Sequence, residues 1–252
     1  MDLKVISFNI RCCNDENKNS IKERAPRLDR VISSYNADLI GLQEYRPAWR
    51  KYIRKIFGNK YGMYIKYRTR IIGREATPIL WRKDKFDCLK KGCFWLSDTP
   101  EKQSKGWDEK YNIPRMCAYV ILRDKENGKM FTFMNTHFGF GDAGQIKSVN
   151  LIYEYSKKIS LFPSFIVGDF NMKPDSPAYE LMSKKLTDVN VATVNDKRAT
   201  YHGYHPEKKT DNHIDYIFTD KNIKPVAFKI IDDTVDGLFP SDHYGLHASL
   251  EI

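Results

Sequence analysis

The chain has 252 residues, with 42 Lys and Arg against 32 Asp and Glu, and a formal net charge of +10 at pH 7. Hydrophobic residues make up 41% and charged residues 29%, which excludes disordered, collagen-like and coiled-coil classes. A chain of this length buries enough surface to fold without disulfides or metal. The positive charge indicates a polyanionic partner, such as nucleic acid, although scattered lysines are also typical of a solvated surface.

Hydrophobic periodicity predicts alternating helices and strands in the first part of the chain and hairpins in the middle. The expected strands cover residues 2–8, 38–43, 61–67, 77–82, 86–96, 115–124, 129–137, 164–168, 213–219, 225–231 and 244–250. The expected helices cover residues 25–36, 47–57, 145–160 and 177–183, and a hairpin turn is expected at 126–129. This mixture predicts an α+β protein with mixed sheets.

The first helix has two possible starts. Ser20 and Glu23 have the spacing of a capping box, but a helix beginning there would contain Pro26. Because an interior proline costs about 3 kcal/mol, we place the start near Ala25, with Pro26 in the first turn. No linker or repeat divides the chain, so we expect a single domain over residues 1–252 and a monomer.

The cysteines carry no metal-binding or disulfide pattern. They form no C-x-x-C pair and are odd in number: Cys12, Cys13, Cys88, Cys93 and Cys117. We expect free thiols in a reducing compartment. No apolar run reaches 18 residues, so no membrane span is expected. A strand pattern begins at residue 3 and leaves no room for a signal peptide, so we expect a cytoplasmic protein, unless a leader was removed.

Six segments place polar side chains at or near predicted strand ends, where sites are commonly built. These residues are Asn9 with Arg11, Glu44, His137, Asp169 with Asn171, Asp215, and Asp242 with His243. Hard oxygen ligands favour magnesium, manganese or calcium over structural zinc. Histidines offer proton transfer near neutral pH, and Arg11 and Arg115 can fork onto phosphate oxygens. The combination predicts metal-assisted hydrolysis of a phosphoester.

The same residues fall into blocks that resemble a known family. The blocks are Ser-Phe-Asn-Ile-Arg (7–11), Leu-Gln-Glu (42–44), Asn-Thr-His (135–137), Gly-Asp-Phe-Asn (168–171), His-Ile-Asp-Tyr-Ile-Phe (213–218) and Ser-Asp-His (241–243). In this order they resemble the endonuclease/exonuclease/phosphatase superfamily of metal-dependent phosphoesterases. The segment 94–100, Gly106-Trp-Asp and Pro114-Arg115 resemble its small stand-alone bacterial hydrolases.

The resemblance implies a four-layered α/β sandwich of deoxyribonuclease type, with two mixed sheets packed face to face and helices outside. It implies catalytic roles for His243, Asp215, Asp169, His137, Asn171 and Asn9. It implies that Glu44 holds Mg²⁺, or Mn²⁺ or Ca²⁺, with Asn9 and Asp242 close by, and that Asp169 and Asn171 orient the attacking water or bind a second metal. It places Arg11, Arg115 and His137 at the substrate phosphate, and it implies no organic cofactor.

The predicted function is magnesium-dependent hydrolysis of a phosphodiester in a nucleic acid or nucleotide. The alternatives are a phosphomonoesterase for a soluble phosphorylated sugar, inositol or nucleotide, and an inactive polyanion-binding module. A G-x-G-x-x-G stretch at 139–144 is also typical of dinucleotide sites, but only one such unit exists and we interpret it as a substrate-facing loop. Aromatic and basic residues interleave at 45–46, 49–52 and 64–70, as in strand-binding surfaces and in ordinary amphipathic ones.

Overall fold

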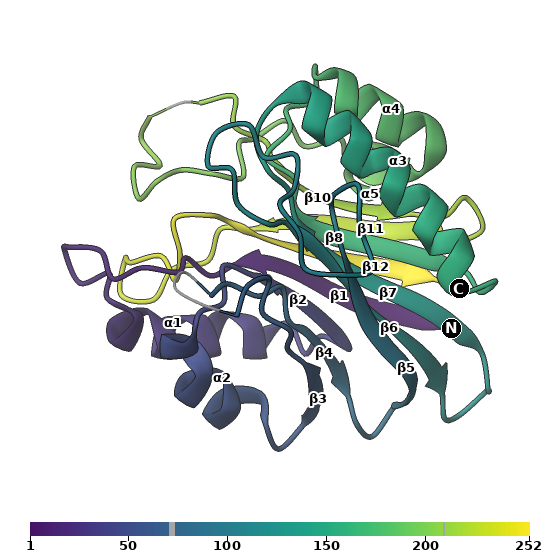
Figure 1. Cartoon of the computed structure of the whole chain (residues 1–252). Helices are drawn as coiled ribbons and strands as arrows, with labels where there is room; N and C mark the ends of the chain where they lie inside the picture. The colour runs from purple at the N-terminus through teal and green to yellow at the C-terminus, as the bar shows by residue number, and fades with distance from the viewer. Residues whose placement is uncertain (71–73, 209) are drawn as a thin grey trace.

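Two six-stranded mixed sheets pack face to face, and helices cover their outer faces, as Figure 1 shows. The computed structural model describes residues 1–70, 74–208 and 210–252. Helices α1 and α2 lie outside one sheet, and α3 and α4 lie outside the other. This arrangement confirms the predicted four-layered α/β sandwich.

The first sheet has the strand order β11-β12-β1-β2-β4-β3. Its strands are β1 (Asp2–Asn9), β2 (Leu39–Gln43), β3 (Tyr61–Tyr64), β4 (Ile79–Arg82), β11 (Lys224–Ile231) and β12 (Gly245–Glu251). Strands β1 and β2 are parallel, and the other pairs of this sheet are antiparallel. Its outer face is covered by α1 (Ile21–Ser34), the short 3₁₀ helix η1 (Pro47–Trp49) and α2 (Arg50–Phe57).

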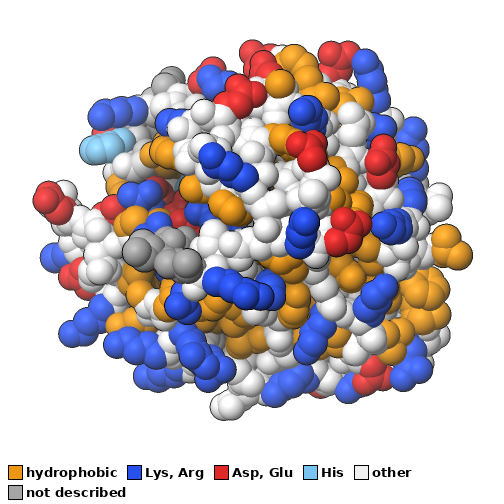
Figure 2. All heavy atoms as spheres, in the orientation of Figure 1, with side chains coloured by type: hydrophobic (Ala, Val, Ile, Leu, Met, Phe, Trp, Pro, Cys, Tyr) orange, Lys and Arg blue, Asp and Glu red, His pale blue; other side chains and the backbone are white. Residues whose placement is uncertain are grey.

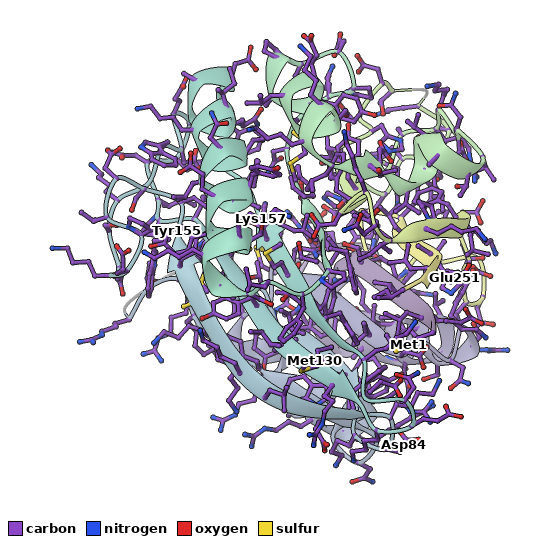
Figure 3. The ribbon with its side chains drawn as sticks, turned by 90° about the vertical axis from the view of Figure 1, so that its right-hand side faces the viewer. Met1, Asp84, Met130, Tyr155, Lys157 and Glu251 are labelled. Carbon is purple, nitrogen blue, oxygen red and sulfur yellow. The ribbon has the colours of Figure 1, made fainter. Side chains whose placement is uncertain are left out.

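The second sheet has the strand order β5-β6-β7-β8-β10-β9. Its strands are β5 (Phe86–Trp95), β6 (Met116–Asp124), β7 (Met130–His137), β8 (Ser164–Asp169), β9 (Thr187–Asp188) and β10 (Asp215–Thr219). The remaining helices are α3 (Asp142–Ile159), α4 (Pro177–Lys185) and α5 (Val189–Thr193). Figure 3 shows Tyr155 and Lys157 on α3, which lies over the outer face of this sheet.

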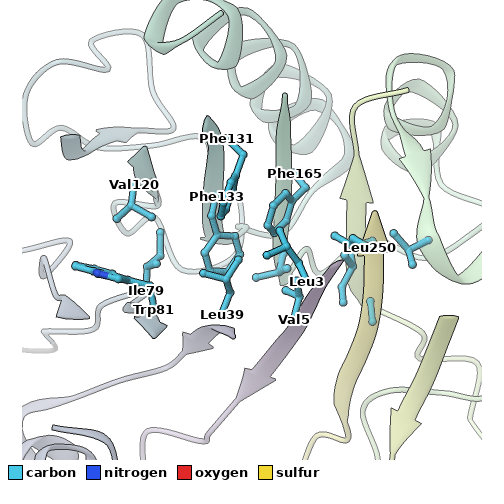
Figure 4. Packing of buried hydrophobic residues seen from close by; sticks show 14 of the residues in the cluster. Leu3, Val5, Leu39, Ile79, Trp81, Val120, Phe131, Phe133, Phe165 and Leu250 are labelled. Carbon is cyan, nitrogen blue, oxygen red and sulfur yellow. The ribbon is translucent and has the colours of Figure 1, made fainter. Parts of the chain in front are cut away.

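The alternation of apolar residues along the strands builds two layers of core at once. On β1, Leu3 and Val5 face the second sheet and pack in a cluster that includes Phe165, as Figure 4 shows. Ile6 and Phe8 face the other way and pack beneath α1 and α2. Because successive side chains of a strand point to opposite faces, each inner strand can contribute to both layers.

A polar link joins the two sheets near one end. Asn135 on β7 accepts a hydrogen bond from Gln43 Nε2 (2.8 Å) and donates from Nδ2 to the backbone oxygens of Leu42 and Pro78, both at 2.8 Å. These hydrogen bonds fix how the end of β2 lies against the end of β7, while the buried Gln43 Oε1 has no partner among the described residues.

The start of α1 differs from the prediction. The helix begins at Ile21, and the capping box exists: Ser20 N donates to Glu23 Oε2 (3.1 Å) and Glu23 N donates to Ser20 Oγ (3.4 Å). Pro26 therefore lies inside the helix. The first turn is held by the buried guanidinium of Arg24, which donates to the backbone oxygens of Ile10 (2.6 Å) and Asn19 (2.8 Å). These contacts offset the backbone hydrogen bond that a proline cannot donate.

Several boundaries are shifted. The predicted helix at 47–57 opens as the 3₁₀ turn η1, and the strand predicted over 61–67 ends at Tyr64. The short elements β9 and α5 were not predicted. The hairpin turn at 126–129 is confirmed, with Gly128 at φ 74°. All five cysteines are free thiols, as predicted. Within the described residues, no helix has the length and apolar character needed to cross a bilayer.

Candidate active site

Strand register brings the predicted residues together at one end of the sandwich. His137 is paired with Asp169 across β7 and β8, and Asp169 is paired with Asp215 across β8 and β10. In the facing sheet, Asn9 ends β1 and Glu44 directly follows β2. All of these residues except Asn9 and Asp215 line one cleft of about 880 Å³. The chain ends lie at the opposite end of the sheets, where Met1 and Glu251 are labelled in Figure 3.

Asp169 is the centre of the cluster. Its Oδ2 accepts a hydrogen bond from Asn9 Nδ2 (2.9 Å) and lies 3.5 Å from His137 Nε2 and 3.8 Å from His243 Nε2. Its Oδ1 accepts from the backbone N–H of Asn171 (3.0 Å). Burial, together with repulsion from the Asp215 carboxylate, raises the pKa of Asp169. One carboxylate oxygen is thus within reach of two imidazoles and an amide.

The two histidines have opposite electrostatic environments. Burial alone would lower the pKa of His243, but the carboxylate of Asp215, whose Oδ2 lies 2.9 Å from His243 Nδ1, outweighs it, with Asp169 adding to the effect. The result raises the pKa of His243 to about 10. Burial, then the positive charges of Arg115 and Arg68, hold the pKa of His137 well below its usual range. His243 is therefore suited to hold a proton and His137 to remain neutral.

Glu44 and Asp242 add two further carboxylates. Glu44 Oε2 accepts from the backbone N–H of Cys12 (2.8 Å) and its Oε1 accepts from Asn9 Nδ2 (3.2 Å). Burial opposes ionisation of Glu44, but the Cys12 hydrogen bond and the charge of His243 lower its pKa. Burial raises the pKa of Asp242, and the nearby Glu44 carboxylate raises it further.

These carboxylates fit a hard divalent cation. Glu44, Asp169 and Asp242 line the same cleft, and burial together with a neighbouring carboxylate raises the pKa of both aspartates. Asp169, Asp215 and His243 also offer ligand atoms that lie within 4.8 Å of one another. Buried carboxylates that repel one another are relieved by a bound cation, and oxygen donors select magnesium-like ions over zinc.

Two predicted residues make contacts other than those expected. The guanidinium of Arg11 is forked onto Asp15, at 3.0 Å from Nε and 2.9 Å from Nη2, and its Nε lies 3.5 Å from Asp242. Asn9 Oδ1 accepts from the backbone N–H of Arg11 (3.0 Å), so its amide nitrogen faces Glu44 and Asp169. In this orientation Asn9 is a hydrogen-bond donor to the carboxylates and offers no oxygen to a cation.

Arg115 lies in the cleft as expected, and an unpredicted residue fixes it. Arg115 Nε donates to Asp108 Oδ2 (2.9 Å), and both side chains are buried. Among the described residues, the buried Nη1 of Arg115 has no hydrogen-bond partner. Such a donor calls for a ligand oxygen or water. The sequence signal for Asp108 was the Gly106-Trp-Asp segment, from which no role was assigned.

The G-x-G-x-x-G stretch serves this loop. A Cβ on Gly144 would meet the backbone oxygen of Trp107 at 2.1 Å, and one on Gly139 would meet Asp108 Cα at 2.8 Å. The glycines thus let the segment 107–109 pack against the start of α3, which places Asp108 beside Arg115. The stretch also reaches the cleft itself, since Phe140 lines it, so this packing role adds to the predicted approach to the site.

We expect Gly144→Ala to raise KM for a phosphodiester several-fold, because the added methyl group must displace Trp107 and with it Asp108 and Arg115. Overpacking of this kind also costs about 1–3 kcal/mol of stability. The measurements are kcat and KM with bis-p-nitrophenyl phosphate, together with the midpoint of urea unfolding. Gly128→Ala is the control, since Gly128 has φ 74° and open space around it, so its loss should lower stability and leave KM unchanged.

A charged wall of the cleft was predicted only in part. Glu75 bridges two arginines, with Arg68 Nη2 at 2.9 Å from Oε2 and Arg46 Nη2 at 3.0 Å from Oε1. All three residues line the cleft. Arg46 and Arg68 belong to the interleaved stretches 45–46 and 64–70, for which a strand-binding surface was one of two interpretations, whereas Glu75 was not singled out. On another part of the rim, the Tyr111 ring is exposed and its centroid lies 5.5 Å from that of Phe140.

Comparison with known proteins agrees with the predicted family. A model of the Endonuclease/Exonuclease/phosphatase family matches residues 6–243. The chain belongs to this family. Members of the family are phosphoesterases and nucleases, so the protein is an enzyme of this hydrolase class.

Solved structures of the family share the whole fold. A family protein from Bacteroides thetaiotaomicron is 27% identical, with a TM-score of 0.90 over 99% of this chain and 97% of that chain. A structure described as a mannosyl-6-phosphatase from the same organism has the same identity and TM-score and covers 99% and 100% of the two chains. Zebrafish (D. rerio) TDP2 in complex with a single-stranded DNA product is 18% identical, with a TM-score of 0.78, covers 100% and 99%, and shows the fold alone.

An uncharacterised protein of Acanthamoeba polyphaga mimivirus is 25% identical over 202 residues. The match covers 66% of this chain and only 29% of the viral protein.

Proposed function

We propose that this enzyme is a magnesium-dependent phosphodiester hydrolase that acts on a nucleic acid or nucleotide. The observation that carries the proposal is the position of Asp169, with two histidines and the Asn9 amide around one oxygen. The cleft extends from this centre to the Arg46 and Arg68 wall and to the Tyr111 rim. A diester needs room on both sides of its phosphorus, and this cleft offers it. A single domain over residues 1–252, a monomeric state and a cytoplasmic location belong to the same proposal.

Each residue has a role in the proposed reaction. Asp215 holds the protonated His243 through Nδ1 and so directs its Nε2 toward Asp169. Asp169 orients the attacking water and accepts its proton, while the imidazolium stabilises the charge that develops on the phosphate. Asn9 Nδ2 donates a hydrogen bond to Asp169 Oδ2 and so holds this carboxylate in place. Arg115 and neutral His137 donate to the equatorial phosphate oxygens, where charge develops.

Glu44 and Asp242, with Asp169, are the residues that would hold the magnesium ion. When bound there, such an ion would supply positive charge that stabilises the transition state of phosphoester hydrolysis. Asn171 acts through its backbone, since its N–H donates to Asp169 and its side chain donates to Phe138 O (3.1 Å). Arg11 contacts both Asp15 and Asp242, and so it positions the carboxylate of Asp242.

Hydrolysis of a sugar phosphomonoester is the second candidate. The observation that favours it is the 27% identity and full-length overlap with the Bacteroides thetaiotaomicron structure described as a mannosyl-6-phosphatase. A preference for p-nitrophenyl phosphate and mannose 6-phosphate over diesters would select this candidate.

We expect EDTA to abolish hydrolysis of bis-p-nitrophenyl phosphate and added Mg²⁺ to restore it, because the clustered carboxylates need a cation to bind an anionic substrate. Glu44→Gln should raise the Mg²⁺ concentration for half-maximal rate by about 10–100-fold, since it removes one ionised ligand. The panel includes aryl diester, aryl monoester, DNA and RNA, each with and without chelator. Full activity in EDTA would refute the metal-dependent mechanism.

A further inference from the structure

A second groove, of about 770 Å³, lies between the start of α1 and the η1–α2 segment; we call it the α1–α2 groove. Its basic residues are Lys22, Arg50, Lys51 and Arg54. Among the residues described, no Asp or Glu lines it. Figure 2 shows Lys and Arg side chains gathered on the face over α1 and α2.

The four cations of the α1–α2 groove are exposed and unpaired. Some surface lysines elsewhere are paired with carboxylates, as Lys85 is with Asp38 (2.7 Å) and Lys157 with Asp220 (3.0 Å). In the described part of the chain, no carboxylate forms an ion pair with any of the four. Like charges gathered without counter-charges repel one another, so an anion bound among them is favoured.

The groove and the active-site cleft are lined by neighbouring residues of the same two loops. The loop after β1 contributes Arg11 and Cys12 to the cleft and Asn14 to the groove. The loop after β2 contributes Glu44 and Arg46 to the cleft, and Pro47 and Ala48 to the groove. An extended ligand with one phosphate in the cleft can therefore continue over this rim.

We propose that the α1–α2 groove binds the phosphate backbone of a single-stranded nucleic acid whose scissile phosphate lies in the cleft. The inference rests on the proposed function and specifies its substrate class. Lysine and arginine contacts of this kind neutralise successive phosphates and do not read sequence.

The aromatic residues in and next to the η1–α2 segment determine how many bases could stack in the groove. Trp49 and Tyr45 are fully buried in the core beneath α1 and α2, so neither ring is available to stack on a base, and the amphipathic interpretation holds for both. Tyr52 is half-buried and lines the groove, with Lys51 Nζ 4.8 Å from its ring centroid. One ring beside several cations is a surface that tracks a backbone and stacks few bases, which fits a single strand without sequence preference.

The test compares a variant of the groove with a matched control. Lys22→Gln/Arg50→Gln/Arg54→Gln removes three charges from the groove. Lys90→Gln/Lys91→Gln/Lys221→Gln removes three exposed lysines outside both cavities. All six side chains are exposed, so both variants should fold.

Binding of fluorescein-labelled single strands of 3 and 15 nucleotides is measured by anisotropy in Ca²⁺, and kcat/KM for the same strands and for bis-p-nitrophenyl phosphate is measured in Mg²⁺. We expect the groove variant to bind the long strand at least about tenfold more weakly at low salt. The slope of log affinity against log salt should become shallower by about 2, as three lost contacts to a single strand predict. The short strand and the aryl diester should be unaffected, and the control variant should match wild type.

Equal long-strand binding by the groove variant and the control would overturn the inference, as would equal losses for the short and long strands. An aryl diester turned over in Mg²⁺ without any binding of single strands would overturn the inference and leave the proposed function intact. Long-strand binding that depends on the groove, with no hydrolysis of any substrate, would support the groove and refute the proposed function. Anionic phosphatidylserine vesicles are the further arm: groove-dependent binding to vesicles but not to strands would assign the groove to a membrane surface and overturn the inference.

Discussion

His243→Ala is expected to lower kcat for phosphodiester hydrolysis by about 10²–10⁴-fold, the loss that removal of a general acid or base produces. Asp215 holds the imidazole at 2.9 Å and leaves Nε2 directed toward Asp169. Alanine at 243 removes the positive charge between two buried carboxylates as well as the proton carrier. Asp169→Ala should cost as much, because its Oδ2 is the atom that Asn9 and both histidines surround.

The measurement is kcat with bis-p-nitrophenyl phosphate at saturating Mg²⁺, with near-UV circular dichroism to show that each variant is folded. His205→Ala is the matched histidine control, because His205 is exposed and contacts only Glu207 at 3.2 Å among the described side chains. It should keep the wild-type rate. A folded His243→Ala protein with wild-type kcat would remove His243 from the mechanism.

The effects of replacing His243 and Asp169 should not be independent. If His243 and Asp169 act together in one step, the double variant His243→Ala/Asp169→Ala should be hardly slower than the worse single variant. Additive losses would mean that the groups act in separate steps, for example with Asp169 holding the metal and His243 stabilising the transition state. The double variant thus separates two roles that the geometry places on adjacent atoms.

Strand ends explain why the sequence predicted most of this site. Asn9, Glu44, His137 and Asp169 each end or follow an apolar run. Because side-chain direction and register are fixed once a strand is buried on both faces, polar residues at strand ends fall on one edge. The register of β7, β8 and β10 then sets His137, Asp169 and Asp215 side by side. Local pattern and family resemblance were sufficient for that part.

Contacts made through the backbone were not predictable. Arg11, Glu44 and Asn171 lie at the ends of β1, β2 and β8 with φ of 57°, 57° and 48°. Non-glycine residues adopt this left-handed region at a cost and only where surrounding structure holds them. No residue type signals it for Glu or Arg. The contacts of Arg11 with Asp15 and of Asn9 Nδ2 with Asp169 depend on this local geometry, which explains why their orientations were not predicted.

The other parts of the structure that were not predicted depend on buried charged residues. Arg24 and Asp108 were assigned no role from the sequence, yet both are buried. Arg24 satisfies backbone oxygens of the loop that carries the site, and Asp108 fixes Arg115. Such residues depend on a loop folding over them, and composition cannot separate them from exposed neighbours.

Arg24→Met is therefore expected to lower the free energy of unfolding by a few kcal/mol, since each buried carbonyl oxygen left without a donor costs about 1–3 kcal/mol. The guanidinium donates to Ile10 O (2.6 Å), to Asn19 O (2.8 Å) and to Arg11 O (3.1 Å), and it lies 5.2 Å from the Trp49 ring centroid. Methionine keeps most of the volume and leaves those carbonyls without a donor. Urea unfolding measures the loss.

Arg30→Met is the matched control on the same helix, because Arg30 is exposed and should change stability by no more than about 0.5 kcal/mol. The loop that Arg24 holds also presents Cys12 N to Glu44, so Arg24→Met should raise the Mg²⁺ concentration needed for activity even where the protein stays folded. The stability of Arg24→Lys should fall between those of Arg24→Met and Arg30→Met, since an ammonium group can donate to only some of the carbonyl oxygens that the guanidinium reaches. Equal unfolding midpoints for Arg24→Met and Arg30→Met would show that the capping box alone holds the start of α1 and that the site loop is fixed by other contacts.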